Sequence, residues 1–234
     1  MTILFALILS LQDGEAKEFQ GLKYRLFKPE AVEGKLPLVL FLHGAGERGD
    51  DNQAQTKHGV KGFLGRMSKD PHVLVAPQCP KGQKWNDVDW HAATHATPEK
   101  PSEPMGKVMG LLDVLLKELP VDPKRVYVTG LSMGGYGTWD LLTRRPELFA
   151  AGAPVCGGGD ESQAAKIAKI PQWIFHGDKD TVVKPLRSRN MVEALKKAGG
   201  DPKYSEYPGV GHNAWDKAYS DPAFFDWLFA QRRP

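Results

Sequence analysis

The sequence predicts an α/β protein, a three-layer sandwich with a mostly parallel sheet between two layers of helices. Short β-rich runs alternate with amphipathic helical patterns along the chain, and several of these runs are apolar at almost every position. Strands covered by helices on both faces have this composition, whereas half-exposed strands alternate apolar and polar residues. We therefore expect ligands to bind outside the carboxyl ends of the parallel strands.

Seven runs rich in β-branched and aromatic residues are predicted as strands. The run "LPLVLFL" is apolar throughout, which is typical of a strand near the centre of a sheet. The predicted strands are Lys23–Phe27, Leu36–Leu42, His72–Pro77, Arg125–Gly130, Ala150–Val155, Gln172–Gly177 and Lys203–Pro208.

Four segments between these runs have helical patterns. "MGKVMGLLDVLLKEL" repeats apolar residues three and four positions apart, which gives a helix one buried face. "GYGTWDLLTRR" stops before Pro146, and "LRSRNMVEALKKAGG" ends in glycines that suit a helix C-terminus. "DPAFFDWLFAQRR" places Asp221 at the N-cap and Pro222 at the first helical position.

The composition is that of an ordinary globular protein. The chain has 234 residues, of which 41% are hydrophobic and 25% charged, and its net charge is +3 with acids and bases interspersed. We therefore expect neither nucleic acid nor membrane as a partner, and the oligomeric state stays open. Residues 17–234 are predicted to form a single domain.

The N-terminal segment 1–16 has features of an export signal. Its apolar core, Ile3–Leu11, is too short to span a bilayer, and Gly14-Glu15-Ala16 has the small-x-small pattern that a signal peptidase cuts. This predicts a secreted or periplasmic protein. Because no Lys or Arg precedes the apolar run, an apolar strand or a misassigned start is the alternative, and the protein would then be cytoplasmic.

The two cysteines, Cys79 and Cys156, follow different predicted strands and lack CxxC spacing. We expect two buried thiols and no metal site, with a single disulfide as the alternative.

The long stretch Gln78–Pro104 has little periodicity and carries Trp85 and Trp90. Irregular connections of this length are usually functional, so we expect it to shape a pocket; a loose surface loop is the alternative.

Ser132 lies in "GLSMG", a G-x-S-x-G pattern between a predicted strand and a predicted helix. A sharp strand-to-helix turn crowds the residues on either side of the serine, so only glycines fit there, and the hydroxyl projects from the sheet. A serine hydroxyl needs a base to take its proton. Of the seven histidines, His212 lies on a glycine-bearing loop after the last predicted strand, so it is the predicted base.

An acid that orients the base is expected between the serine and the histidine, in the chain order serine, acid, histidine. "WIFHGDKDTVV" offers Asp178 and Asp180, both directly after a predicted strand. A carboxylate here would hold the imidazole tautomer, but Asp178 could equally cap backbone N–H groups of the turn. The residues alone leave the two open.

Taken together, these motifs make the chain similar to α/β-hydrolases, in particular to the compact esterases and peptidase-like enzymes related to dienelactone hydrolases, feruloyl esterases and polyhydroxybutyrate depolymerases. The matching pieces are "FLHGAGERGDDN", "VAPQCP", "GLSMGGYGTWDLL", "FHGDKDTVV" and "YPGVGHNAW". The resemblance implies that Asp180 is the catalytic acid. It also implies that the backbone N–H groups of Ala45 and Met133 form the oxyanion hole, with His43 bracing the loop.

The expected reaction is ester hydrolysis through an acyl-enzyme on Ser132, with neither metal nor cofactor. Trp85, Trp90 and Trp215 fall on predicted loops at the active end of the sheet and are predicted to bind substrate, which favours a small or aromatic acyl ester, free or linked to a polysaccharide. A peptidase related to prolyl oligopeptidases is the alternative, and a non-catalytic binding module is a second. The remaining tryptophans are predicted to lie in the core: Trp139, Trp173 and Trp227.

Overall fold

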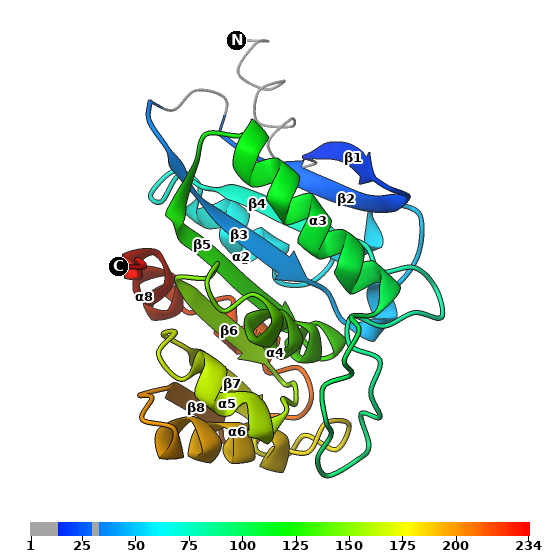
Figure 1. Ribbon diagram of the computed structural model, residues 1–234, viewed down its shortest axis with the longest axis vertical. Helices are drawn as coiled ribbons and strands as arrows, with labels where there is room; N and C mark the ends of the chain where they lie inside the picture. The colour runs from blue at the N-terminus through cyan, green and yellow to red at the C-terminus, as the bar shows by residue number, and fades with distance from the viewer. Residues whose placement is uncertain (1–13, 30–32) are drawn as a thin grey trace.

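The computed structural model describes residues 14–29 and 33–234, and it contains one eight-stranded sheet (Figure 1). The strand order is β1-β2-β4-β3-β5-β6-β7-β8. The pairs β1–β2 and β2–β4 are antiparallel, and the remaining neighbours are parallel. The predicted mostly parallel α/β architecture is therefore confirmed. The strands are β1 (Glu15–Phe19), β2 (Leu22–Phe27), β3 (Leu36–Leu42), β4 (Val73–Pro77), β5 (Val121–Leu131), β6 (Ala151–Val155), β7 (Trp173–Gly177) and β8 (Lys203–Tyr207).

Helices cover both faces of the sheet. In Figure 1, α3, α4, α5 and α6 lie in front of the sheet, while α2 and α8 lie behind it. This is the predicted three-layer arrangement. The α-helices are α2 (Val60–Arg66), α3 (Glu103–Glu118), α4 (Met133–Arg144), α5 (Ala164–Ile167), α6 (Leu186–Lys197), α7 (Trp215–Ala218) and α8 (Pro222–Ala230), and the 3-10 helices are η1 (Ala45–Glu47), η2 (Ala54–Thr56) and η3 (Glu161–Gln163).

Strand β3 shows why the sequence of a central strand is apolar at every position. Leu38, Leu40 and Leu42 pack with the helices of the front layer, while Val39 and Phe41 pack into the second core with α2 and α8. Because alternate side chains point to opposite faces, burial of both faces requires an apolar residue at every position.

The first strand, β1, was not predicted. Its residues "EAKEF" are mostly exposed, and it pairs along one edge only, with β2. A polar strand of this kind has no apolar alternation to mark it. The predicted cleavage point after Ala16 falls inside β1, so a cut there would remove the first two residues of the strand. Residues 1–13 of the predicted signal lie outside the described residues.

Both cysteines are free, buried thiols, as predicted. Cys79 follows β4 and Cys156 follows β6, and in the sheet order these strands are separated by β3 and β5. In the described part of the chain, no helix is long and apolar enough to cross a bilayer.

Candidate active site

Ser132 occupies a sharp turn between β5 and α4. It has φ 53° and ψ −116°, a left-handed conformation that is uncommon for a residue with a side chain. Its backbone N–H donates to the carbonyl oxygen of Val155 on β6 at 2.9 Å, which ties the turn to the sheet. Strained conformations of this kind persist only where surrounding structure fixes them, and they are concentrated at functional sites.

The glycines around Ser132 are required by close backbone contacts. A Cβ added to Gly134 would collide with the carbonyl oxygen of Leu42 on β3. A Cβ on Gly135 would lie 2.6 Å from the carbonyl oxygen of Val155, and one on Gly130 would lie 2.5 Å from the carbonyl oxygen of Gly134. The helix α4 can therefore approach the sheet closely enough to present the Ser132 hydroxyl only because these positions lack side chains.

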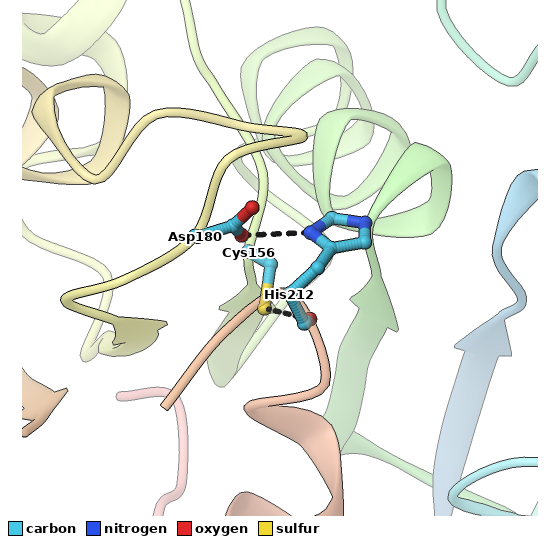
Figure 2. A group of neighbouring side chains, drawn as sticks. All are labelled: Cys156, Asp180 and His212. Carbon is cyan, nitrogen blue, oxygen red and sulfur yellow. Dashed lines mark hydrogen bonds and ion pairs between the residues drawn. The ribbon is translucent and has the colours of Figure 1, made fainter. Parts of the chain in front are cut away.

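Three side chains from distant parts of the sequence meet at the carboxyl edge of the sheet. Ser132 follows β5, Asp180 follows β7 and His212 follows β8. The Ser132 Oγ lies 2.9 Å from His212 Nε2, and His212 Nδ1 lies 2.7 Å from Asp180 Oδ2. Figure 2 shows the second of these contacts, between the Asp180 carboxylate and the imidazole. The arrangement lets the imidazole accept a proton from the serine while the carboxylate fixes its tautomer.

Asp180 is held by donors on both of its oxygens. Oδ1 accepts from the backbone N–H groups of Val182 and Val183, each at 2.9 Å. Burial alone would raise the pKa of Asp180, but hydrogen bonds from His176, His212 and the Val183 N–H outweigh it and hold the pKa well below its usual range. The carboxylate therefore stays ionised beside His212.

Asp178 has a different task. Its Oδ1 accepts from the Gly209 backbone N–H at 2.7 Å, and its own N–H donates to the Tyr207 carbonyl at 3.1 Å. These bonds tie the loop after β7 to the loop after β8, which carries His212. Of the two acids that the residues alone leave open, Asp180 contacts the imidazole and Asp178 ties the turn to the loop after β8.

His176 is a contact of Asp180 that sequence reasoning missed. It is fully buried at the end of β7, and its Nδ1 lies 2.7 Å from Ser188 Oγ. Its Nε2 lies 2.8 Å from the Val183 carbonyl oxygen and 3.2 Å from Asp180 Oδ2, so it is shared between these two acceptors. Its spacing in "FHGDKD", four residues before Asp180, was the available signal, but a histidine at a strand end also has simpler structural explanations.

The two expected oxyanion donors flank the serine. Ala45 begins η1 and Met133 begins α4, and both line the cavity above Ser132. First-turn N–H groups have no partner within their own helix, so they are free to donate to a ligand. His43 braces this loop, because its Nδ1 donates to the Gly44 carbonyl at 2.6 Å and its Nε2 accepts from the Cys79 N–H at 2.9 Å. Burial lowers the pKa of His43 to about 4, so it stays neutral.

A cavity of about 340 Å³ opens onto Ser132 and His212. Of the three tryptophans predicted to bind substrate, Trp90 and Trp215 line it. The prediction for Trp85 was wrong: its side chain has no exposed surface, and its indole N–H donates to the His43 carbonyl at 3.1 Å. Trp85 lies in the core, where it packs against α4 and hydrogen-bonds to the loop that begins at His43, so it supports the site from within the core. Trp139 and Trp173 are buried as predicted, and Trp227 packs partly buried against the core.

The long connection between β4 and α3, which carries Trp90, is fastened by charged side chains. The Arg187 guanidinium on α6 donates to the Ala92 carbonyl at 2.8 Å and lies 2.6 Å from His95 Nδ1. Arg144 on α4 donates to the Pro98 carbonyl at 2.7 Å, and Asp160 accepts from the Thr97 N–H at 2.6 Å. Trp90 and His91 of this segment line the cavity at Ser132, in agreement with the expectation that the segment shapes a pocket.

Cys156, Asp180 and His212 have potential metal-binding atoms within 4.8 Å of one another (Figure 2). The chemistry of this set does not favour a metal. Burial, together with the nearby Asp180 charge, raises the pKa of the Cys156 thiol, which donates to the His212 carbonyl at 3.2 Å. A metal would need a thiolate, and it would have to displace Asp180 from His212.

Known proteins with similar structure and sequence agree with this architecture. A crystal structure of a thermostable esterase is 39% identical and superimposes with a TM-score of 0.87 over 96% of this chain and 64% of that chain. The bifunctional acetylxylan esterase/xylanase of Neocallimastix patriciarum is 26% identical over 74% of this chain. Feruloyl esterase B of Thermothelomyces thermophilus is 23% identical over 98% of this chain and 90% of its own length.

This chain covers only 24% of the length of the Neocallimastix enzyme. It covers 31% of the length of a poly(3-hydroxyalkanoate) depolymerase and 30% of that of a poly(3-hydroxybutyrate) depolymerase. The family model of the dienelactone hydrolases matches residues 58–221, a span that includes Ser132, Asp180 and His212. With its mostly parallel sheet and this match, the chain belongs to the dienelactone hydrolase family and has the α/β-hydrolase fold.

Proposed function

We propose that this chain is a serine-dependent carboxylic ester hydrolase that works through an acyl-enzyme. The observation that carries the proposal is the continuous set of contacts from Ser132 Oγ through His212 to the Asp180 carboxylate, at 2.9 Å and 2.7 Å. A neutral imidazole in this position activates the hydroxyl, and an ionised Asp180 stabilises the imidazolium that forms.

In the first half of the reaction, the Ser132 hydroxyl gives its proton to His212 Nε2 while Oγ bonds to the ester carbonyl carbon. The carbonyl oxygen becomes an oxyanion that accepts hydrogen bonds from the Ala45 and Met133 N–H groups. When the intermediate collapses, the ester C–O bond breaks and the leaving alkoxide takes the proton from His212. In the second half, water gives a proton to His212 and attacks the acyl carbon, and Oγ recovers that proton as the acid leaves.

A small or aromatic acyl group is the substrate feature that the cavity supports best. Its inner wall contains Trp90, Tyr136 and Val183, and the rings of Trp90 and Tyr136 lie 6.4 Å apart. Apolar and aromatic walls of this kind bind planar acyl chains by excluding water. The similarity to a protein called feruloyl esterase B supports the same choice.

The test is the variant Ser132→Ala, measured with p-nitrophenyl acetate, with methyl ferulate and with an active-site fluorophosphonate. We expect kcat to fall by at least about 10⁴-fold and covalent labelling to disappear. Ser68→Ala, at an exposed serine after α2, is the matched control and should keep both. Full turnover by Ser132→Ala would overturn the proposal. Peptide p-nitroanilides cleaved as fast as the esters would favour the peptidase alternative.

A further inference from the structure

Two polar side chains in the wall of the catalytic cavity have few polar contacts with the rest of the chain that the structure describes. Glu47 and His58 both line the cavity, and Glu47 is only 7% exposed. Among the described residues, the Glu47 carboxylate accepts no hydrogen bond, and its ion-pair contact with His58 Nε2 is long, at 3.8 Å. The Glu47 oxygens are not among the buried atoms that lack a partner; they face the cavity, where a ligand can donate hydrogen bonds to them.

The Glu47 carboxylate lies close to the proposed reaction centre. A Cβ built on Gly44 would be 3.0 Å from Glu47 Oε2 and 2.7 Å from Leu131 Cδ1. Gly44 directly precedes Ala45, the proposed oxyanion donor, and Leu131 directly precedes Ser132. Glu47 therefore lies beside the loop that carries Ala45, and it lines the same cavity as Ser132.

Trp215 places these polar residues on the side of His212. The Trp215 ring lies 5.8 Å from the His58 ring and 5.2 Å from the His212 ring, measured between centroids. Because His212 must protonate the departing alkoxide, the alcohol part of the ester has to lie beside it. The apolar cluster of Val88, Tyr136, Val183 and Trp90 is a separate group of contacts, suited to the acyl part.

We propose that Glu47, His58 and Trp215 form a subsite for a polyhydroxylated alcohol, the leaving group of the ester. This inference rests on the proposed function and specifies its substrate class. A polyol offers hydroxyl protons to the Glu47 carboxylate, and its hydroxyl groups can also hydrogen-bond to the imidazole of His58. The flat face of Trp215 covers the C–H groups of the same molecule. Polar groups built to bind hydroxyls discriminate strongly against analogues that lack them.

The surroundings suit a large neutral alcohol. Trp215 is also a wall of a second cavity of about 500 Å³, which gives the alcohol room to extend beyond the catalytic cavity. That second cavity is lined by Lys61 and Arg66 together with Asp216. Arg66 is paired with Asp70 and Asp226, so the charges around this cavity are largely balanced, which suits a neutral alcohol.

The experiment compares three acetates that share an acyl group and differ in the alcohol: glycerol monoacetate, propyl acetate and acetylcholine. In Glu47→Met, we expect kcat/KM for glycerol monoacetate to fall about tenfold more than for propyl acetate, with the difference mainly in KM. Glu47→Gln, which keeps one acceptor oxygen, should recover part of the loss. Glu193→Gln, an exposed carboxylate on α6, is the matched control and should change none of the ratios.

Equal losses on glycerol monoacetate and propyl acetate would overturn the inference, and so would a larger loss on acetylcholine. A second measurement separates this inference from the proposed function. Binding of glycerol monoacetate to Ser132→Ala, followed by saturation-transfer NMR, should weaken several-fold when Glu47→Met is added, whether or not the wild-type protein cleaves any ester. Unchanged binding in that double variant would equally reject the subsite.

Discussion

His176 Nε2 lies 3.2 Å from Asp180 Oδ2, the same oxygen that His212 Nδ1 contacts at 2.7 Å. Two imidazoles therefore converge on one carboxylate oxygen, one from the end of β7 and one from the loop after β8. His176 does not reach the serine, so we regard it as a positioning residue that acts through Asp180.

Replacing His176 should weaken catalysis without abolishing it. In His176→Phe, Asp180 loses one donor, so its pKa should rise and its hold on His212 should loosen. We expect kcat to fall by about tenfold, which corresponds to one hydrogen bond to a charged group. The pH profile of stability should also change: the stabilisation that the ionised Asp180 contributes should be lost at a higher pH than in the wild type, because the pKa of Asp180 would be less depressed. Ser188→Ala, which leaves the Asp180 contact intact, is the control and should lose less. A folded His176→Phe with the wild-type pH profile would contradict the role.

The close approach at Gly134 predicts a large loss of stability. In Gly134→Ala, the added Cβ would collide with the carbonyl oxygen of Leu42, so β3 and α4 would have to separate. Overpacking of this kind costs about 3 kcal/mol or more, which for a chain of this size lowers Tm by roughly 6–12 °C. Gly65→Ala in α2 is the control, since nothing lies within 4 Å of its added Cβ, and it should be neutral or slightly stabilising. Equal Tm values for the two variants, measured by calorimetry, would contradict this account.

Two buried histidines predict that stability falls on mild acidification. Burial lowers the pKa of His43 and of His72 to about 4. In the unfolded chain a histidine titrates near about 6.5, so between these values the unfolded state binds more protons than the folded state. The stabilisation is complete above about pH 6.5 and is lost as the pH falls towards 4, by up to about 1.4 kcal/mol per pH unit for each histidine.

Urea unfolding followed by tryptophan fluorescence at several pH values between 7.5 and 4.5 measures this slope. His72→Leu keeps the packing against Phe63 and Phe229 but removes one titrating group, so its stability should vary less with pH than that of the wild type. Parallel curves for the two proteins would show that His72 does not titrate as its burial implies.

Arg187 predicts a defect in substrate binding. Without its guanidinium, the Ala92 carbonyl and His95 lose their partner, and the segment that carries Trp90 should open more often. In Arg187→Met we expect KM for aromatic esters to rise several-fold and the segment 78–104 to be cleaved faster by added protease. Arg189→Met, on the solvent side of the same helix, is the control, since Arg189 pairs with Glu206 at the surface. If Arg187→Met has the KM and the proteolysis rate of the wild type, Arg187 does not hold this segment in place.

The buried strands and the serine turn could be predicted because their physical requirements appear within short stretches of the sequence. The strand Leu36–Leu42 has the predicted bounds, since burial of both faces demands an unbroken apolar run. The serine turn was predictable for the same reason: a helix that begins against the sheet requires glycines at fixed positions around Ser132. Chain order and loop position then pointed to His212.

The remaining features depend on contacts between distant segments. Trp85 lies in a segment without periodicity, and nothing near it in the sequence reveals that its indole reaches His43, which is 42 residues away. The roles of His176 and Glu47 likewise depend on which groups the folded chain brings opposite them. β1 was missed because an exposed edge strand needs no apolar residues.

The separation of Cys79 and Cys156 by two intervening strands means that no covalent cross-link holds this fold together. The native state should consequently form equally well in a reducing and in an oxidising environment. Reagents such as dithiothreitol or glutathione should leave its melting temperature unchanged, so the enzyme can be produced and assayed without control of the redox potential.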